Sequence, residues 1–120
     1  MKFPTIELVD RYAIAVVKFE KTNGANQEEL DFYLAEIKEI NLNPRNPKLV
    51  ELIEHHKYVW SLEDDFKKGR VDGLSLEEIG RRAIHIRDLG YKRVELKNTL
   101  AELIDDPVRE IKQDHSSEKN

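Results

Sequence analysis

The feature that most constrains the fold of this chain is a helix start at residues 75–78, Ser-Leu-Glu-Glu. A serine followed three residues later by a glutamate forms a capping box, in which each side chain binds a backbone N–H group that the helix leaves unpaired. Leu74 and Ile79 are spaced to pack against each other as a hydrophobic staple. Apolar residues then recur at helical spacing as far as Ile104. The sequence therefore predicts one long helix that ends before Pro107.

Two short helices are predicted in the first third of the chain. Residues 6–21 have apolar residues at helical spacing, although the apolar run from Tyr12 to Val17 also fits a buried strand. The length of this segment and its charged ends favour a helix. Asn26 is placed to cap a second helix, whose apolar stripe continues to Ile40.

A second long helix is predicted from residue 47 to about residue 68, with Asn46 as its cap and Gly69 at its end. Two short and two long helices predict an all-α fold, an antiparallel four-helix bundle that forms a single domain over residues 1–111. The polar tail, residues 112–120, is predicted to be disordered. Because the long pair would extend beyond the short pair and expose apolar surface, we expect a homodimer in which a second copy covers that surface.

Composition narrows the class of protein. The absence of cysteine excludes disulfides and leaves histidine and carboxylates as the only strong metal ligands. The chain has 24 acidic and 20 basic residues and a net charge of −4, which argues against a nucleic-acid partner. Its apolar runs are too short to span a bilayer, and its N-terminus lacks the layout of a signal peptide. We therefore expect a cytoplasmic protein with no membrane partner.

Polar residues interrupt the apolar faces of the predicted helices. Residues 55–65, His-His-Lys-Tyr-Val-Trp-Ser-Leu-Glu-Asp-Asp, place His56 and Glu63 on the same helix face as Trp60. The first and fourth helices carry charged residues on or beside their apolar faces, namely Asp10, Arg11, Arg82, Arg93 and Lys97. An unpaired buried charge is costly, so these groups should meet one another. The sequence predicts ion pairs that set Glu63, together with Asp64 and Asp10, against Arg82, Arg93 and Lys97.

Two interpretations fit such a cluster. The favoured one is a structural network of ion pairs that fixes the register of the helices. The alternative is a pocket whose arginines bind an anionic small molecule, such as a phosphate or a nucleotide-sugar. An excess of cations over carboxylates would favour the pocket. The candidate ligand-binding residues are Asp10, Arg11, His56, Trp60, Glu63, Asp64, Arg82, Arg93 and Lys97.

Two pairs of glutamates bear on metal binding. Glu36 and Glu39 lie one turn apart on one predicted helix, and Glu51 and Glu54 lie one turn apart on the next. This pattern resembles the all-helical nucleotide pyrophosphohydrolases of the MazG type, which hold magnesium with such pairs, although Glu54 stands where that family has an aspartate. The resemblance implies a magnesium-dependent nucleotide hydrolase as one alternative, with these four glutamates as ligands. Hard cations need several convergent oxygens, so no metal cofactor is favoured.

A wider resemblance covers most of residues 6–100. The matched residues are Leu8-Val9-Asp10-Arg11 with Lys18, Trp60 with Glu63 and Asp64, and Arg93 with Lys97. They are similar to the motifs of a group of small uncharacterised bacterial helical proteins, some of them encoded beside genes for lipopolysaccharide or other glycan assembly. The chain departs from that group at His56, where the group has asparagine, and at Gly90-Tyr91, where it has Asn-Asp. The resemblance implies a link with glycan metabolism and no particular reaction.

The function predicted first is therefore non-catalytic, that of a cytoplasmic helical interaction or accessory protein that forms homo-oligomers. The second is an anion- or nucleotide-sugar-binding module or enzyme built on the charged cluster. The third is the magnesium-dependent nucleotide hydrolase. The sequence leaves open whether the chain is an enzyme, and which ligand or partner it binds.

Overall fold

A computed structural model of the chain describes residues 4–104, and these residues contain four helices and no strand. The helices are α1 (Thr5–Lys21), α2 (Gln27–Glu39), α3 (Pro47–Lys67) and α4 (Leu76–Leu103). The prediction of an all-helical chain with two short and two long helices is thus confirmed, and the apolar run that also fitted a strand is part of α1. The predicted tail, residues 112–120, and the predicted domain end at residue 111 lie outside the described residues.

The helix starts follow the capping signals with one exception. The Ser75 hydroxyl accepts a hydrogen bond from the Glu78 backbone N–H at 3.1 Å, and the Asn46 side chain accepts from the backbone N–H groups of Lys48 and Leu49. The prediction that Asn26 caps α2 with its side chain is wrong. Its amide Nδ2 instead donates to the Ala15 carbonyl at 3.0 Å, so this side chain ties α2 to α1.

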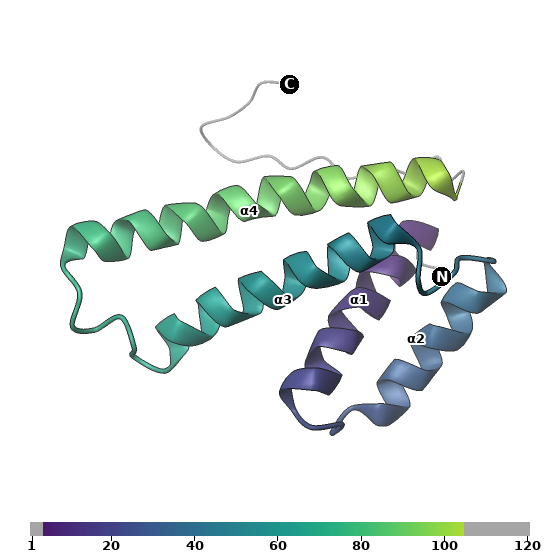
Figure 1. The fold of residues 1–120 in the computed structure, drawn as a ribbon, viewed down its shortest axis with the longest axis horizontal. Coiled ribbons are helices and arrows are strands. Elements are labelled where there is room, and N and C mark those ends of the chain that lie inside the picture. The colour runs from purple at the N-terminus through teal and green to yellow at the C-terminus, as the bar shows by residue number, and fades with distance from the viewer. Residues whose placement is uncertain (1–3, 105–120) are drawn as a thin grey trace.

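The helices form two hairpins, α1 with α2 and α3 with α4 (Figure 1). Helix α1 also packs against both α3 and α4, whereas α2, among the described helices, contacts α1 alone. Helix α1 is therefore the element that joins the two hairpins, and the hydrophobic core lies around it. The core residues are Ile6, Val9, Tyr12, Ala13, Val17, Ile37, Leu42, Leu49, Leu52, Ile53, Leu96, Leu100 and Ala101.

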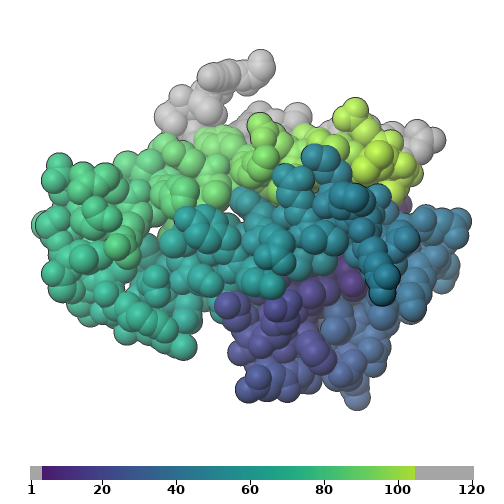
Figure 2. Space-filling view, in the orientation of Figure 1, coloured from purple at the N-terminus to yellow at the C-terminus, as the bar shows by residue number. Residues whose placement is uncertain are grey.

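The α3/α4 hairpin is longer than the part that α1 covers. We call residues 47–60 and 91–103 its proximal half, and residues 61–90, which include the connection between the helices, its distal half. All buried residues of α3 and α4 lie in the proximal half, and in the distal half only Val71, in the connection, is buried. Figures 1 and 2 show the distal half extending past α1 and α2 at the left of the molecule.

The last turn of α1 explains where this cover stops. Glu20 and Lys21, near the end of α1, contact Lys57 and Ser61 of α3, with an ion pair of 3.0 Å and a hydrogen bond of 3.4 Å. Beyond Ser61, Glu63 still borders a hollow that Ile14 and Val17 of α1 also line, whereas the hollow between the distal ends of α3 and α4 is lined by residues of those two helices. None of the described helices is long and apolar enough to cross a membrane.

Candidate functional site

Asp10 of α1 is the centre of a buried charged cluster. Its Oδ1 atom lies 2.8 Å from Nε2 of His56 in α3. Its Oδ2 atom lies 3.7 Å from Nη1 of Arg93 and 3.8 Å from Nζ of Lys97, both in α4. One carboxylate thus contacts side chains from both helices of the other hairpin. We call Glu7, Asp10, His56, Arg93 and Lys97 the Asp10 cluster.

Lys97 is the most deeply buried charged residue that the structure describes, with 2% of its surface exposed. Its ammonium lies 2.8 Å from Oε1 of Glu7, which is one helical turn before Asp10. A buried ammonium is tolerated when carboxylates neutralise it and accept its hydrogen bonds. Glu7 accepts a hydrogen bond from the ammonium and Asp10 adds a second negative charge at 3.8 Å, so α1 neutralises the charge that α4 carries into the core.

The protonation of Asp10 is set by opposing effects. Burial by itself would raise the pKa of Asp10, because desolvation penalises the charged form. The hydrogen bond from His56 and the charges of His56, Lys97 and Arg93 outweigh burial and hold the pKa of Asp10 below its ordinary value. Asp10 is therefore an anion at neutral pH. The neighbouring His55 has its pKa lowered, first by burial and then by the charge of His56.

The two carboxylates of the Asp10 cluster, Glu7 and Asp10, match Arg93 and Lys97 in number. His56 adds a third positive charge when it is protonated. An excess of cations was the feature that would have favoured an anion-binding pocket, and the cluster has such an excess only with His56 protonated. An aspartate and a histidine at 2.8 Å can also transfer protons in catalysis. Asp10 is buried, whereas His56 is partly buried and lines two surface hollows, and the pair joins α1 to α3.

The sequence predicted that Glu63 pairs with the cations of α4, and this prediction is wrong. Glu63 is exposed and forms no ion pair or hydrogen bond with another described residue. Asp64 pairs with Arg70 at 3.2 Å and with Lys68 at 3.4 Å, both near the end of its own helix. Glu63 and Asp64 are thus not buried against the cations of α4.

The predicted cations divide in the same way. Arg93 and Lys97, in the proximal half, pair with Asp10 as described. Arg82, in the distal half, is partly exposed and pairs within α4, its Nε lying 3.1 Å from Oε2 of Glu78. The pairing predicted between Arg82 and the acidic residues of α3 is therefore wrong. Glu7 was not predicted at all, although its position one turn before Asp10 on α1 was a usable signal.

The remaining predicted site residues are separate from this cluster or border it. Trp60 is partly buried and packs against the hydrophobic core. Arg11 is exposed and borders a hollow of about 290 Å³ between α1 and α2, which Asp10 and Glu29 also line.

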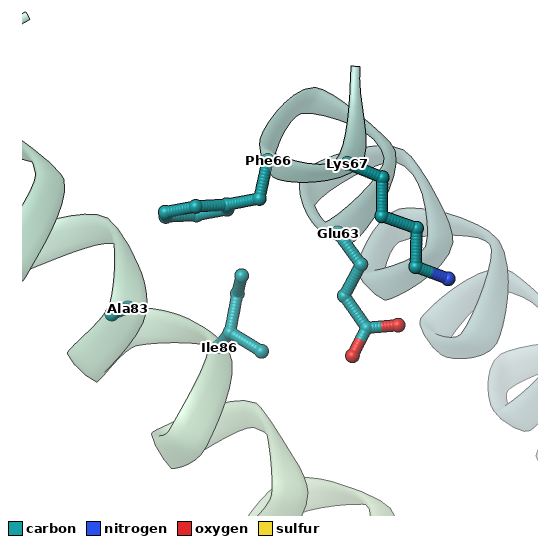
Figure 3. Close-up of a pocket in the computed structure, with 5 residues that line it drawn as sticks. All are labelled: Glu63, Phe66, Lys67, Ala83 and Ile86. Atoms are coloured by element: carbon teal, nitrogen blue, oxygen red, sulfur yellow. The ribbon is translucent and has the colours of Figure 1, made fainter. Parts of the chain in front are cut away.

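Three hollows adjoin one another around Glu63. The largest, about 350 Å³, lies between the distal ends of α3 and α4, and we call its lining the distal groove: Glu63, Phe66, Lys67, Ala83 and Ile86 (Figure 3). A second of about 290 Å³ continues along α4 to Arg93, and a third of about 190 Å³ continues along α3 to Trp60. Glu63 lines all three. The third hollow is also lined by Ile14 and Val17 of α1, whereas the lining of the distal groove comes from α3 and α4.

The glutamates of the magnesium alternative are held apart from one another. Glu51 pairs with Lys48 at 3.2 Å and with Lys92 at 3.7 Å, and Glu54 pairs with Lys57 at 3.4 Å. Glu36 and Glu39 are in α2, which does not contact α3. Between residues 4 and 104 the structure brings no three acidic, histidine or cysteine side chains together in a way that could hold a metal ion.

Comparison of the chain with known protein families, with curated proteins and with solved structures finds no match. Evidence for function therefore comes from two regions of the molecule itself, the buried Asp10 cluster and the open distal groove.

Proposed function

We propose that this protein acts without catalysis, as a helical interaction protein that forms a homodimer through the distal half of its α3/α4 hairpin. The observation that carries the proposal is the distal groove, an apolar surface that no other described helix covers. Phe66 and Ile86 face each other across it, and Ala83 borders it from α4 (Figure 3).

The physical argument is that an apolar helix face in water needs a partner. Covering apolar surface is worth about 25 cal/mol per Å², and a stable interface covers about 800 Å² on each partner. The distal half offers more than the groove, since Leu76, two turns before Ala83 on α4, is 87% exposed. Two distal halves laid face to face would make a four-helix unit, and in that unit the antiparallel bundle predicted from the sequence would be completed by two chains.

The Asp10 cluster supports a structural role in this proposal. Its ion pairs join α1 to both α3 and α4 and so hold the two hairpins together. We therefore favour neither an anion-binding function nor magnesium-dependent hydrolysis. The link with glycan metabolism stays a prediction of the sequence resemblance alone.

Sedimentation equilibrium of the full chain tests the proposal. We expect a monomer–dimer equilibrium with a dissociation constant between about 1 and about 200 micromolar. These values correspond to binding free energies of about −8 to −5 kcal/mol. A monomer throughout that range would contradict the homodimer.

A thermal-shift panel tests the alternatives on the same sample. Nucleotides, nucleotide-sugars and magnesium are expected to leave the melting temperature unchanged, because ligands stabilise only a folded state that binds them. A saturable shift with a nucleotide-sugar would favour the anion-binding alternative, and one that requires magnesium would favour the hydrolase.

A further inference from the structure

Two unpaired charges of opposite sign border the distal groove on the same helix. Glu63 and Lys67 are one turn apart on α3, both are exposed, and both line the groove. Figure 3 shows the two side chains next to each other along α3, with Glu63 between Lys67 and Ile86. Neither forms an ion pair or hydrogen bond with another residue in the described part of the chain.

The other charges near this end of α3 are already engaged. Asp64 is paired with Lys68 and Arg70. Arg82 of α4 is paired with Glu78, one turn earlier in its own helix. Glu63 and Lys67 are thus the charges at the groove that the chain itself leaves unmatched, although a glutamate four residues before a lysine is a favourable spacing for pairing on a helix.

This arrangement is self-complementary. In a twofold dimer, where residue i of one copy meets residue j of the other, residue j of the first copy also meets residue i of the second. If the α3 helices of two copies pack antiparallel, with the twofold axis near Asp65, Glu63 of each copy approaches Lys67 of the other. Phe66, which lies between these two positions in the sequence, would then be covered in both copies.

We propose that the distal groove is covered by a second copy of this chain, and that Glu63 and Lys67 of the two copies form two reciprocal ion pairs across the twofold axis. This inference rests on the proposed homodimer and adds its symmetry, its central residues and the reason for self-recognition. An unrelated partner would need its own matching pair of charges at the same spacing, whereas a second copy supplies them without further requirement.

Charge exchange tests the inference on the full chain. Glu63→Lys places two cations at the groove and Lys67→Glu places two anions there, so each variant alone should repel its own copy. We expect the dissociation constant of each homodimer to rise at least about tenfold over that of the unaltered chain. An equimolar mixture of the two variants should form a heterodimer whose dissociation constant returns to within about threefold of the unaltered value.

The controls separate charge complementarity from loss of folding and from total charge. Glu39→Lys makes the same change in net charge at an exposed site on α2, away from the groove, and should leave dimerisation unchanged. The double variant Glu63→Lys with Lys67→Glu should dimerise again, because the reciprocal pairs are restored with reversed signs. Circular dichroism of every variant should show unchanged helix content, since both altered side chains are exposed.

Native mass spectrometry and sedimentation velocity read the result, and the two proposals fail differently. Homodimers that persist in both single variants, or a mixture that does not recover, would overturn the reciprocal pairs and leave the homodimer standing. An unaltered chain that stays monomeric would overturn the homodimer and this inference together.

Discussion

The proximal and distal halves of the α3/α4 hairpin are built from the same two helices and have different surroundings. In the proximal half, α1 lies against both helices, and residues such as Leu52 and Leu100 have no exposed surface. In the distal half the same helix faces continue, but Phe66 and Ile86 are only partly buried and Ala83 is exposed. The difference lies in where α1 crosses the hairpin, since its last residue, Lys21, contacts Ser61 and the helix runs away from α3 toward that end (Figure 1).

The same contrast separates buried charges from exposed ones. His56 and Glu63 are two turns apart on one face of α3. His56 meets the Asp10 carboxylate at 2.8 Å because α1 packs against its position, whereas Glu63 is exposed and borders three hollows. A polar residue on an apolar helix face thus becomes part of a buried network in one half and a border residue of an open groove in the other. The proximal half should therefore determine stability, and the distal half should determine association.

The largest expected effect is that of Asp10→Ala on stability. This change leaves the buried ammonium of Lys97 and the guanidinium of Arg93 without the carboxylate that both approach, and we expect the free energy of unfolding to fall by about 3–5 kcal/mol. Urea denaturation followed by circular dichroism measures the change.

Lys97→Met is the matched control for Asp10→Ala. Methionine fills a similar volume with an apolar group, and Asp10 keeps His56 and Arg93 as partners, so a smaller loss of about 1–2 kcal/mol is expected. If Asp10→Ala costs less than Lys97→Met, the carboxylate is not the centre of the network.

The sequence was sufficient for features that depend on neighbours in the chain. The helix start at Ser75 and the cap at Asn46 were predicted because a cap is made by residues two or three positions away. A helix wheel likewise assigned Asp10, Arg93 and Lys97 to inward faces, because the face of a residue depends only on its position in the helix.

The errors concern features that depend on distant elements. Nothing near Glu63 in the sequence specifies where α1 ends relative to α3, so the wheel placed Glu63 and His56 on one face and could not separate their surroundings. The amide of Asn26 was assigned to its own helix for the same reason, whereas the fold brings the Ala15 carbonyl within 3.0 Å of it. Partners across helices follow from how the hairpins pack, which local patterns do not encode.

Substitutions of apolar residues in the two halves should have an intermediate effect on the free energy of unfolding, and the effect should differ between the halves. Leu100→Ala removes a side chain with no exposed surface from the core and should lower the free energy of unfolding by about 2–5 kcal/mol. Ile86→Ala removes a partly exposed side chain from the distal groove, and we expect a loss of about 1 kcal/mol or less in the monomer.

For association, Ile86→Ala should have the larger effect and Leu100→Ala the smaller one. Ile86→Ala should weaken the proposed dimer, and Leu100→Ala should leave its dissociation constant unchanged as long as the chain stays folded. Denaturation at low protein concentration and sedimentation at high concentration give the two quantities separately. Equal effects of both substitutions on both quantities would mean that the halves are not distinct.

The smallest expected effect is the pH dependence that Asp10 adds to stability. Burial works against its charged form, but His56, Lys97 and Arg93 together hold its pKa below the ordinary value of 3.8. Because the folded state then binds the proton less tightly than the unfolded state, the ionised carboxylate contributes stability above about pH 3.8. That contribution is lost as the pH falls below this value and through the folded-state pKa, as the unfolded state takes up the proton first.

The Asp10→Ala variant isolates this effect from the titration of the other carboxylates. The difference in unfolding free energy between the unaltered chain and Asp10→Ala should narrow as the pH is lowered below 3.8. The amount by which the difference narrows should stay smaller than the full cost of the substitution, because a protonated Asp10 still fills its site and can still form a hydrogen bond. A difference that is independent of pH down to about 2.5 would mean that the proximal half does not depend on the charge of Asp10. The two halves would then differ in their apolar cover alone.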